Sequence, residues 1–148
     1  MLSTIAVEVN SLSIHLTRWA RRADDALGVP PARLSALSVL VFGGDRTMSE
    51  LADAEMVTMA TMSRVVDGLE EMGLAVRRPN PDDARSYVVR ATPKGRRLME
   101  RGRQARVDRL VSLLDEVPAA EIATVERALV LLRHALTEVV ARETAHDL

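Results

Sequence analysis

The chain has 148 residues, enough for one domain or for one domain with a dimerisation extension. Hydrophobic residues make up 47% and charged residues 28%, which is typical of a folded globular protein and not of a disordered one. There is no cysteine, which excludes a disulfide framework, a thiolate zinc site and a thiol-based redox switch. No apolar run approaches the roughly 18 residues of a membrane span, and no secretory signal pattern is seen, so we expect a cytoplasmic protein without membrane contact.

The formal net charge of −1 hides an uneven distribution of charge. Residues 58–106 hold eleven basic and six acidic residues, whereas the rest of the chain holds nine basic and fifteen acidic ones. A basic segment in a nearly neutral chain is expected when only one face of a protein meets phosphate groups.

The first half of the chain is predicted to be helical. Apolar residues recur at steps of three and four over residues 3–27, which predicts an amphipathic helix that ends at Gly28 and Pro30. A second helix is predicted from Pro31 to about Gly43.

Two capping signals divide the next segment. Thr47 followed by Glu50 predicts a capping box before a short helix at 48–54. Thr58 is a second N-cap candidate for a helix at 58–72, whose apolar stripe includes Met62 and Leu69 and which Gly73 closes.

A hairpin and two long helices complete the predicted order. Valine-rich segments at 74–78 and 86–91 are separated by the turn residues 80–83, which predicts a β-hairpin. Thr92 and Pro93 begin a long helix, and Pro118 separates it from a last amphipathic helix. The predicted fold is mainly α with a small β-hairpin wing, that is, a winged helix-turn-helix with a helical dimerisation region.

This order of elements suits a protein that reads double-stranded DNA. The apolar stripe anchors the helix 58–72 and leaves polar side chains near its first turns, as a helix in the major groove requires. We expect the DNA-reading residues of this helix to be Thr58, Met59, Ala60, Thr61, Ser63 and Arg64.

The hairpin offers a second contact with DNA. Asp83 lies two residues before Arg85, so its carboxylate is expected to orient the guanidinium for the minor groove, with Ser86 beside it. The alternative is a surface ion pair that only stabilises the turn. The neighbouring basic residues are expected to contact phosphates: Arg77, Arg78, Arg90, Lys94 and Arg97.

These segments together resemble the MarR family of bacterial transcription regulators. The matching residues run from Leu51 and Ala52 through Arg64 and Gly73-Leu74 to Asp83-Ala84-Arg85 and Thr92-Pro93-Lys94-Gly95. Two positions depart from the family pattern: Ala91 replaces a leucine, and the turn at Glu55-Met56 lacks a glycine.

The resemblance implies one MarR-like domain over residues 1–148. Its DNA-binding lobe would span residues 32–92, and residues 1–28 with 93–148 would form the helical dimerisation region. A homodimer is also expected from the apolar content of these helices, and a two-fold dimer predicts a pseudo-palindromic operator.

Many relatives in this family respond to small aromatic or phenolic acids, which implies a repressor relieved by such an effector. The candidate pocket residues here are His15, Arg18, Trp19 and Phe42, although Trp19 and Phe42 also suit a core position and His15 a surface one.

Two other functions compete with DNA binding. An enzyme is not expected, because the three histidines (His15, His134 and His146) are scattered and no phosphate-binding loop or nucleophile motif is seen, so we also expect no cofactor and no metal. The alternative is a winged-helix module that binds proteins without specific DNA binding, which the basic segment argues against.

Overall fold

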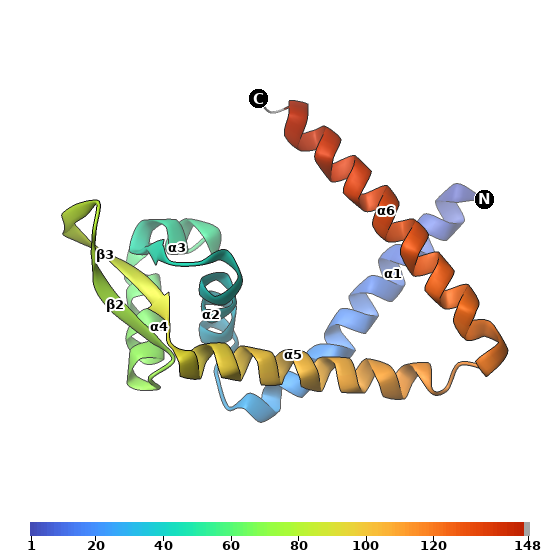
Figure 1. The fold of residues 1–148 in the computed structure, drawn as a ribbon, viewed down its shortest axis with the longest axis horizontal. Helices are drawn as coiled ribbons and strands as arrows, with labels where there is room; N and C mark the ends of the chain where they lie inside the picture. The colour runs from blue at the N-terminus through green and yellow to red at the C-terminus, as the bar shows by residue number, and fades with distance from the viewer. Residues whose placement is uncertain (147–148) are drawn as a thin grey trace. The chain divides into compact units, whose positions relative to one another are not determined.

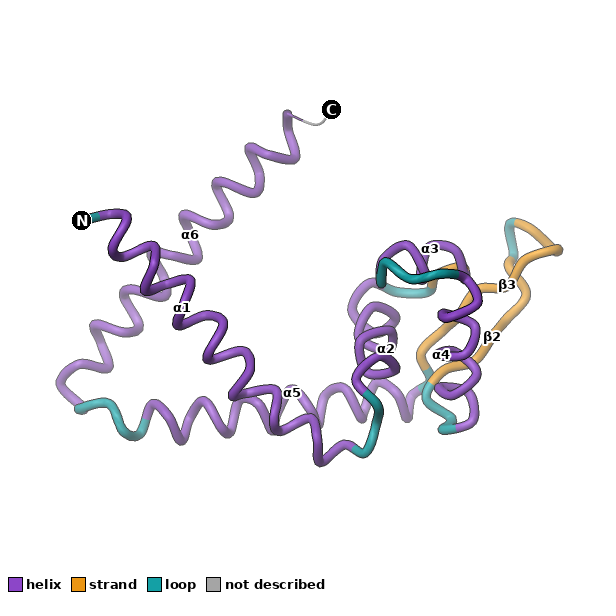
Figure 2. Tube along the Cα trace, turned by 180° about the vertical axis from the view of Figure 1, so that it is seen from behind, coloured by secondary structure: helices purple, strands orange, loops and turns teal. Residues whose placement is uncertain are grey.

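A computed structural model describes residues 1–146, without the side chains of residues 84 and 144–146. The side chain of His146, one of the three histidines considered above, therefore lies outside the described part of the chain. The chain forms two compact units, residues 1–109 and the residues from 110 onward. The fold is mainly α-helical with a small antiparallel sheet, which confirms the predicted fold class (Figures 1 and 2).

The first unit begins with α1 (Leu2–Arg21), which continues into a 3₁₀ helix, η1 (Arg22–Leu27). The prediction of one α-helix over 3–27 was therefore wrong in its last part. Apolar spacing does not distinguish an α-helix from a 3₁₀ helix over only six residues. Gly28 then reverses the chain with a φ of +66°, which favours glycine because it has no Cβ.

Three helices follow in the predicted places: α2 (Pro31–Gly43), α3 (Met48–Ala54) and α4 (Met59–Glu71). Both predicted caps are confirmed. Thr47 Oγ1 accepts a hydrogen bond from the Glu50 amide at 3.2 Å, and the Glu50 carboxylate accepts one from the Thr47 amide at 2.8 Å. These bonds, first from the Thr47 amide and then from its hydroxyl, lower the pKa of Glu50.

A three-stranded antiparallel sheet has the order β1-β3-β2 and consists of β1 (Arg46–Thr47), β2 (Ala75–Asn80) and β3 (Asp83–Ala91). The two hairpin strands are longer than the predicted 74–78 and 86–91. The strand β1 was not predicted, because two residues carry no alternating pattern. These two residues form a strand because they pair with Val88 and Val89 of β3.

The core of the first unit lies between the helices and the sheet. Its fully buried side chains come from all of these elements: Leu37, Leu40, Leu51, Met62, Val66, Leu69, Leu74 and Val89. The helix α5 (Pro93–Leu114) joins this core through Leu98 and Met99. Its predicted cap is confirmed, since Thr92 Oγ1 accepts from the Gly95 amide at 3.1 Å.

The second unit contains the end of α5, a 3₁₀ turn η2 (Ala119–Glu121) and α6 (Ile122–His146). Many of the large apolar side chains of α6 are exposed: Leu129, Val130, Leu131, Leu132, Leu136, Val139 and Val140. No single helix among the described residues is long and apolar enough to cross a membrane. The segments Leu2–Leu27 and Pro31–Gly43 reach that length and composition only together, with a bend of 97° between them.

Candidate nucleic-acid interface

The helix α4 is buried on one side and exposed at its N-terminal end. Met62, Val66 and Leu69 are at most 1% exposed and hold the helix against the core. Thr58 caps the helix, because its Oγ1 accepts from the Thr61 amide at 3.2 Å and donates to Thr61 Oγ1 at 3.0 Å. The helix therefore has a fixed N-terminus that points into solvent.

The six residues that the sequence predicts to read DNA all lie on this end of α4. Five of them are exposed: Thr58, Met59, Ala60, Thr61 and Arg64. Ser63 is half-buried. Hydroxyl, thioether and guanidinium groups together offer the hydrogen-bonding and apolar contacts that base edges require.

The tip of the hairpin is held by side chains that bond to nearby backbone. Asn80 Oδ1 accepts from the Asp82 amide at 3.0 Å, and Asn80 Nδ2 donates to Ser86 Oγ at 2.9 Å. Ser86 Oγ donates in turn to the Asp83 carbonyl at 3.2 Å. The Ser86 hydroxyl thus shapes the turn, and its predicted place beside DNA stays a prediction.

The Asp83 side chain also bonds to the backbone of the turn. Its Oδ1 accepts a hydrogen bond from the Arg85 amide at 3.0 Å, and not from the guanidinium as predicted from the sequence. Two residues of separation suit an Asx-type turn, which a short carboxylate forms readily with the amide two residues on. The Arg85 side chain is exposed at the wing tip.

The predicted phosphate contacts divide into two groups. Among the described residues, Arg78 and Arg97 have no hydrogen-bond or ion-pair partner for their guanidinium groups, and the same holds for Arg64 of α4 and Arg85 of the wing. The other three cations have partners. Arg90 pairs with Asp45 at 2.7 Å, and Lys94 Nζ donates to the Met72 carbonyl at 2.7 Å at the C-terminal end of α4.

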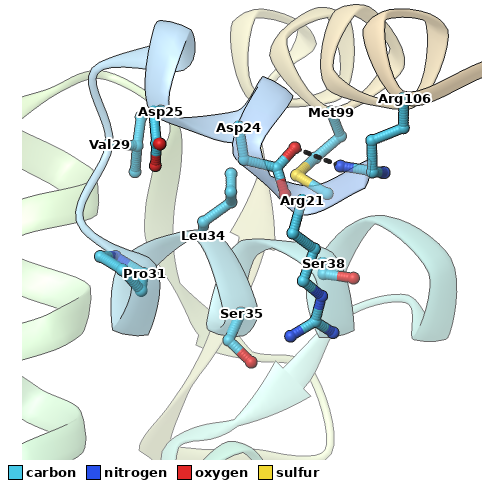
Figure 3. Close-up of a pocket in the computed structure, with 10 residues that line it drawn as sticks. All are labelled: Arg21, Asp24, Asp25, Val29, Pro31, Leu34, Ser35, Ser38, Met99 and Arg106. Atoms are coloured by element: carbon cyan, nitrogen blue, oxygen red, sulfur yellow. Dashed lines mark hydrogen bonds and ion pairs between the residues drawn. The ribbon is translucent and has the colours of Figure 1, made fainter. Parts of the chain in front are cut away.

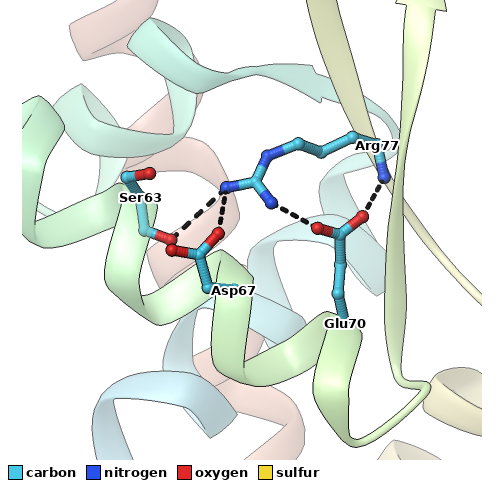
Figure 4. A network of polar contacts seen from close by, with 4 residues as sticks. All are labelled: Ser63, Asp67, Glu70 and Arg77. Atoms are coloured by element: carbon cyan, nitrogen blue, oxygen red, sulfur yellow. Dashed lines mark hydrogen bonds and ion pairs between the residues drawn. The ribbon is translucent and has the colours of Figure 1, made fainter.

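Arg77 departs most from the expected phosphate contact. Its Nη2 donates to Asp67 Oδ1 at 2.7 Å and to the Ser63 carbonyl at 3.4 Å, and its Nη1 bonds to Glu70 (Figure 4). Its side chain is only 24% exposed. Burial alone lowers the pKa of Arg77, but the hydrogen bonds to Asp67 and Glu70 outweigh burial and raise the pKa above its ordinary value.

The turn before α4 has an unusual backbone. Met56 has a φ of +52° and is 92% exposed. This is the position of the Glu55-Met56 departure from the family pattern, where glycine is often found. A side chain in the left-handed region is strained, and no burial of Met56 compensates for it.

None of the four predicted effector residues lines the cavity described below, so their role in effector binding stays a prediction. His15 and Arg18 are exposed, and Phe42 is 66% exposed at the end of α2. Trp19 is half-buried under Arg109, whose guanidinium carbon lies 4.4 Å from the ring centroid. A cation stacked on an aromatic face is a stable arrangement without any ligand.

A cavity of about 430 Å³ lies elsewhere in the first unit, between η1, α2 and α5 (Figure 3). Its lining combines charged groups with apolar and hydroxyl ones: Arg21, Asp24, Asp25, Val29, Pro31, Leu34, Ser35, Ser38, Met99 and Arg106. Asp24 and Arg106, two of the lining residues, form an ion pair with side chains 17% and 26% exposed. Ser35 Oγ donates to Glu55 Oε1 at 3.0 Å, which links the cavity wall to the turn before α4.

Sequence reasoning missed this cavity because its walls come from distant segments. Asp24 and Arg106 are 82 residues apart, and neither belongs to a recognisable motif. The sequence signal for this cavity was the acidic pair Asp24-Asp25, which follows the basic end of a predicted helix. Such a pair is more often part of a solvated surface.

The capped helix, the short helix before it and the adjacent hairpin define a winged helix-turn-helix. A family model described as "MarR family" matches residues 27–86. The chain is 34% identical over 117 residues to the HTH-type transcriptional regulator ML2140 of Mycobacterium leprae, covering 77% of this chain and 82% of that protein.

Solved structures share the fold at lower identity. Transcriptional regulator Tm0710 from Thermotoga maritima aligns with a TM-score of 0.86 and 20% identity, over 94% of this chain and 98% of that one. A mutant of MepR from Staphylococcus aureus, solved bound to an oligodeoxyribonucleotide, aligns with a TM-score of 0.69 and 19% identity, over 89% and 97% of the two chains. The chain belongs to the MarR family of DNA-binding transcriptional regulators, and it is not an enzyme.

Proposed function

We propose that this regulator is a cytoplasmic homodimeric repressor that binds a pseudo-palindromic operator and is released by a small anionic, aromatic effector. The observation that carries the DNA-binding part is the pairing of the exposed N-terminal end of α4 with an exposed wing arginine, Arg85. The MepR structure, solved bound to an oligodeoxyribonucleotide, supports the use of this fold on DNA. In this proposal Arg64 and its neighbours read bases, and Arg78 and Arg97 contact phosphates.

The dimer is supported by apolar side chains that neither unit buries. In α1 these include Leu2, Ile5, Val7 and Leu12, and the exposed apolar residues of α6 form a second such surface. Contiguous exposed apolar surface usually marks an interface. We therefore assign residues 1–28 and 93–148 to dimerisation and residues 32–92 to DNA binding.

Binding to a duplex from the protein's own promoter region tests the DNA-binding proposal. Measured by fluorescence anisotropy, affinity should fall steeply as salt rises, because each phosphate contact releases counterions. Absence of binding at low salt would favour a protein-interaction module instead.

Arg85→Ala tests the wing. We expect weaker operator binding with an unchanged dimer by analytical ultracentrifugation. A loss of dimerisation would show that Arg85 is structural.

Arg64→Ala separates base reading from phosphate contact. Loss of a base contact should relax the sequence preference at one operator position by about 1–3 kcal/mol, measured over a set of single-base operator variants. A uniform loss over all sequences would assign Arg64 to the phosphate backbone.

The repressor role is tested in cells. Deleting the gene should raise transcription from the promoter that the protein binds, measured by a reporter fusion. A fall in transcription would identify an activator.

The cavity of the first unit is the site that we propose for the effector, in place of His15, Arg18, Trp19 and Phe42. A carboxylate or phenolate could replace Asp24 as the partner of Arg106, while Val29, Leu34 and Met99 contact an aromatic ring. A ligand that also engaged Ser35 would compete with its hydrogen bond to Glu55, and so act on the turn before α4.

Benzoate and 4-hydroxybenzoate are suitable probes, with neutral benzyl alcohol as the control. By calorimetry, Arg106→Gln should weaken benzoate binding, whereas Asp24→Asn should strengthen it because it releases Arg106. Equal affinity of both variants would exclude Arg106 as the anion-binding group.

A further inference from the structure

Arg77 is bound to α4, the proposed recognition helix, by both its backbone and its side chain. Its amide donates to Glu70 Oε1 at 2.7 Å, and its guanidinium bonds to the other oxygen of the same carboxylate. The second arm of the guanidinium reaches Asp67 and the carbonyl of Ser63 (Figure 4). One residue of β2 is therefore fixed to three residues along one side of α4.

The register of the sheet explains why Arg77 faces the helix. Arg77 lies opposite Val89, which is fully buried, and Arg78 lies opposite Val88. Because side chains alternate along a strand, Arg77 lies on the face that the core covers and Arg78 on the opposite face. The two adjacent arginines, which the sequence analysis treated alike, therefore have different environments.

The arrangement requires an arginine and not merely a positive charge. A planar guanidinium holds its N–H groups in a fork that bonds two carboxylates and a carbonyl at once, whereas an ammonium is a compact point charge. The two carboxylates are on α4 itself, the helix that carries the predicted base-reading residues. Acidic groups there would otherwise oppose binding to phosphates.

The Ser63 carbonyl links this cluster to the DNA-reading end of the helix. Ser63 and Arg64 are adjacent, and Arg77 lies three residues before Asn80, where the wing turn begins. The cluster thus connects the base-reading segment with the strand that carries the wing.

We infer that Arg77 is a positioning residue, which fixes β2 and its wing to the recognition helix through Asp67, Glu70 and the Ser63 carbonyl, so that helix and wing meet DNA as one unit. The inference rests on the proposed roles of α4 and the wing in DNA binding. Arg77 itself does not touch DNA in this account.

Glu70→Ala gives the sharpest test, because a purely electrostatic role and a positioning role predict opposite changes in operator affinity. Electrostatics alone predicts stronger DNA binding when a negative charge is removed from the DNA-binding lobe. Loss of the positioning contact predicts weaker operator binding, by about tenfold if the charged hydrogen bonds of Glu70 are lost. Alanine is favourable in helices, so α4 itself is not weakened.

Glu71→Ala is the matched control, since Glu71 is the exposed neighbour of Glu70 and lies outside the cluster. It removes the same charge and should leave operator affinity unchanged or raise it. If Glu70→Ala also leaves affinity unchanged or raises it, the inference is overturned.

A second pair of variants keeps the charge constant. Arg77→Lys should weaken operator binding several-fold at unchanged charge, because lysine cannot reach both carboxylates. Arg78→Lys, on the exposed face, should bind within about twofold of the wild type, since a phosphate contact needs only the charge. Equal effects of the two substitutions would contradict the positioning role, even if Glu70→Ala proved too unstable to assay.

Amide hydrogen exchange of the protein without DNA separates failure of this inference from failure of the proposed function. In Glu70→Ala the Arg77 amide loses its acceptor, so its exchange should accelerate by about tenfold or more relative to Glu71→Ala. Unchanged exchange would overturn the inference whether or not the protein binds DNA. Faster exchange in a protein that binds no duplex would instead refute the proposed function and leave the link between β2 and α4 supported.

Discussion

The proposed DNA-binding lobe and the helix α6 use their apolar residues in opposite ways. Between residues 29 and 99, apolar side chains from α2, α3, α4, the sheet and α5 form one buried cluster. Along α6, residues of the same types stay largely exposed, for example Leu131 and Leu136 at 63% and 64%. The lobe thus has its own core, whereas α6 needs another surface to bury its apolar side, which is why we propose a dimer.

Truncating one leucine in each region should give the largest effects and separate the two kinds of packing. Leu69→Ala, at a fully buried position, should cost about 2–5 kcal/mol in the free energy of unfolding of the lobe. Leu136→Ala should instead destabilise the protein in a way that depends on protein concentration, because it weakens subunit association.

Urea unfolding at several protein concentrations measures both effects. A Leu136→Ala effect that is independent of concentration would contradict the proposed role of α6 in dimerisation.

Two helical glycines, Gly95 in α5 and Gly68 in α4, should respond unequally to alanine. A Cβ at Gly95 would clash with the backbone carbonyl oxygen of Leu74, so α5 would have to move away from the sheet. We expect a loss of about 1–3 kcal/mol for Gly95→Ala, as for other overpacked sites.

Gly68→Ala is the control. The atoms nearest to a Cβ at Gly68 belong to the end of the flexible Arg33 side chain, and alanine favours the helix. Its stability should stay within about 1 kcal/mol of the wild type by thermal denaturation. A larger loss at Gly68 than at Gly95 would show that Arg33 cannot move aside.

The capping box of α3 should add a smaller, pH-dependent contribution. Thr47→Ala should cost about 1 kcal/mol, as is usual for an N-cap. The pKa of Glu50 is lowered in the folded state, so its contribution is present above the pKa of an unfolded glutamate and is lost as the pH falls through the lowered value.

Glu50→Gln removes this titration. The free energy of unfolding should therefore be higher for the wild type than for Glu50→Gln at neutral pH, and this difference should disappear in acid. Urea unfolding from pH 7 downward measures it. A difference that grows in acid would contradict the stabilising role of the ionised Glu50 carboxylate.

The smallest effect is expected at the turn before α4. Met56→Gly should stabilise the lobe by about 0.5 kcal/mol, because glycine accepts a positive φ without strain but loses more backbone entropy on folding. Denaturant midpoints of the two proteins measure this difference. A destabilised glycine variant would show that the exposed Met56 side chain contributes contacts.

Local signals were enough to predict most elements of this fold. The caps at Thr47, Thr58 and Thr92 depend on bonds to residues three positions away, so the sequence contains the whole interaction. The 3₁₀ helix η1 was missed because apolar spacing does not distinguish it from an α-helix over six residues, and β1 because it depends on pairing with β3.

Local sequence by itself therefore determined where helices begin, where the hairpin turns, and which residues stand at the exposed end of α4. Tertiary structure decided the partners of charged groups that lie far apart in the chain. Arg77 and Arg78 are equivalent in sequence, yet the register with Val89 and Val88 places only Arg77 on the buried face. Asp24 and Arg106 meet only because η1 and α5 pack together. Electrostatic partnership depends on distance in space, and helical or strand periodicity does not report that distance between segments far apart in the chain.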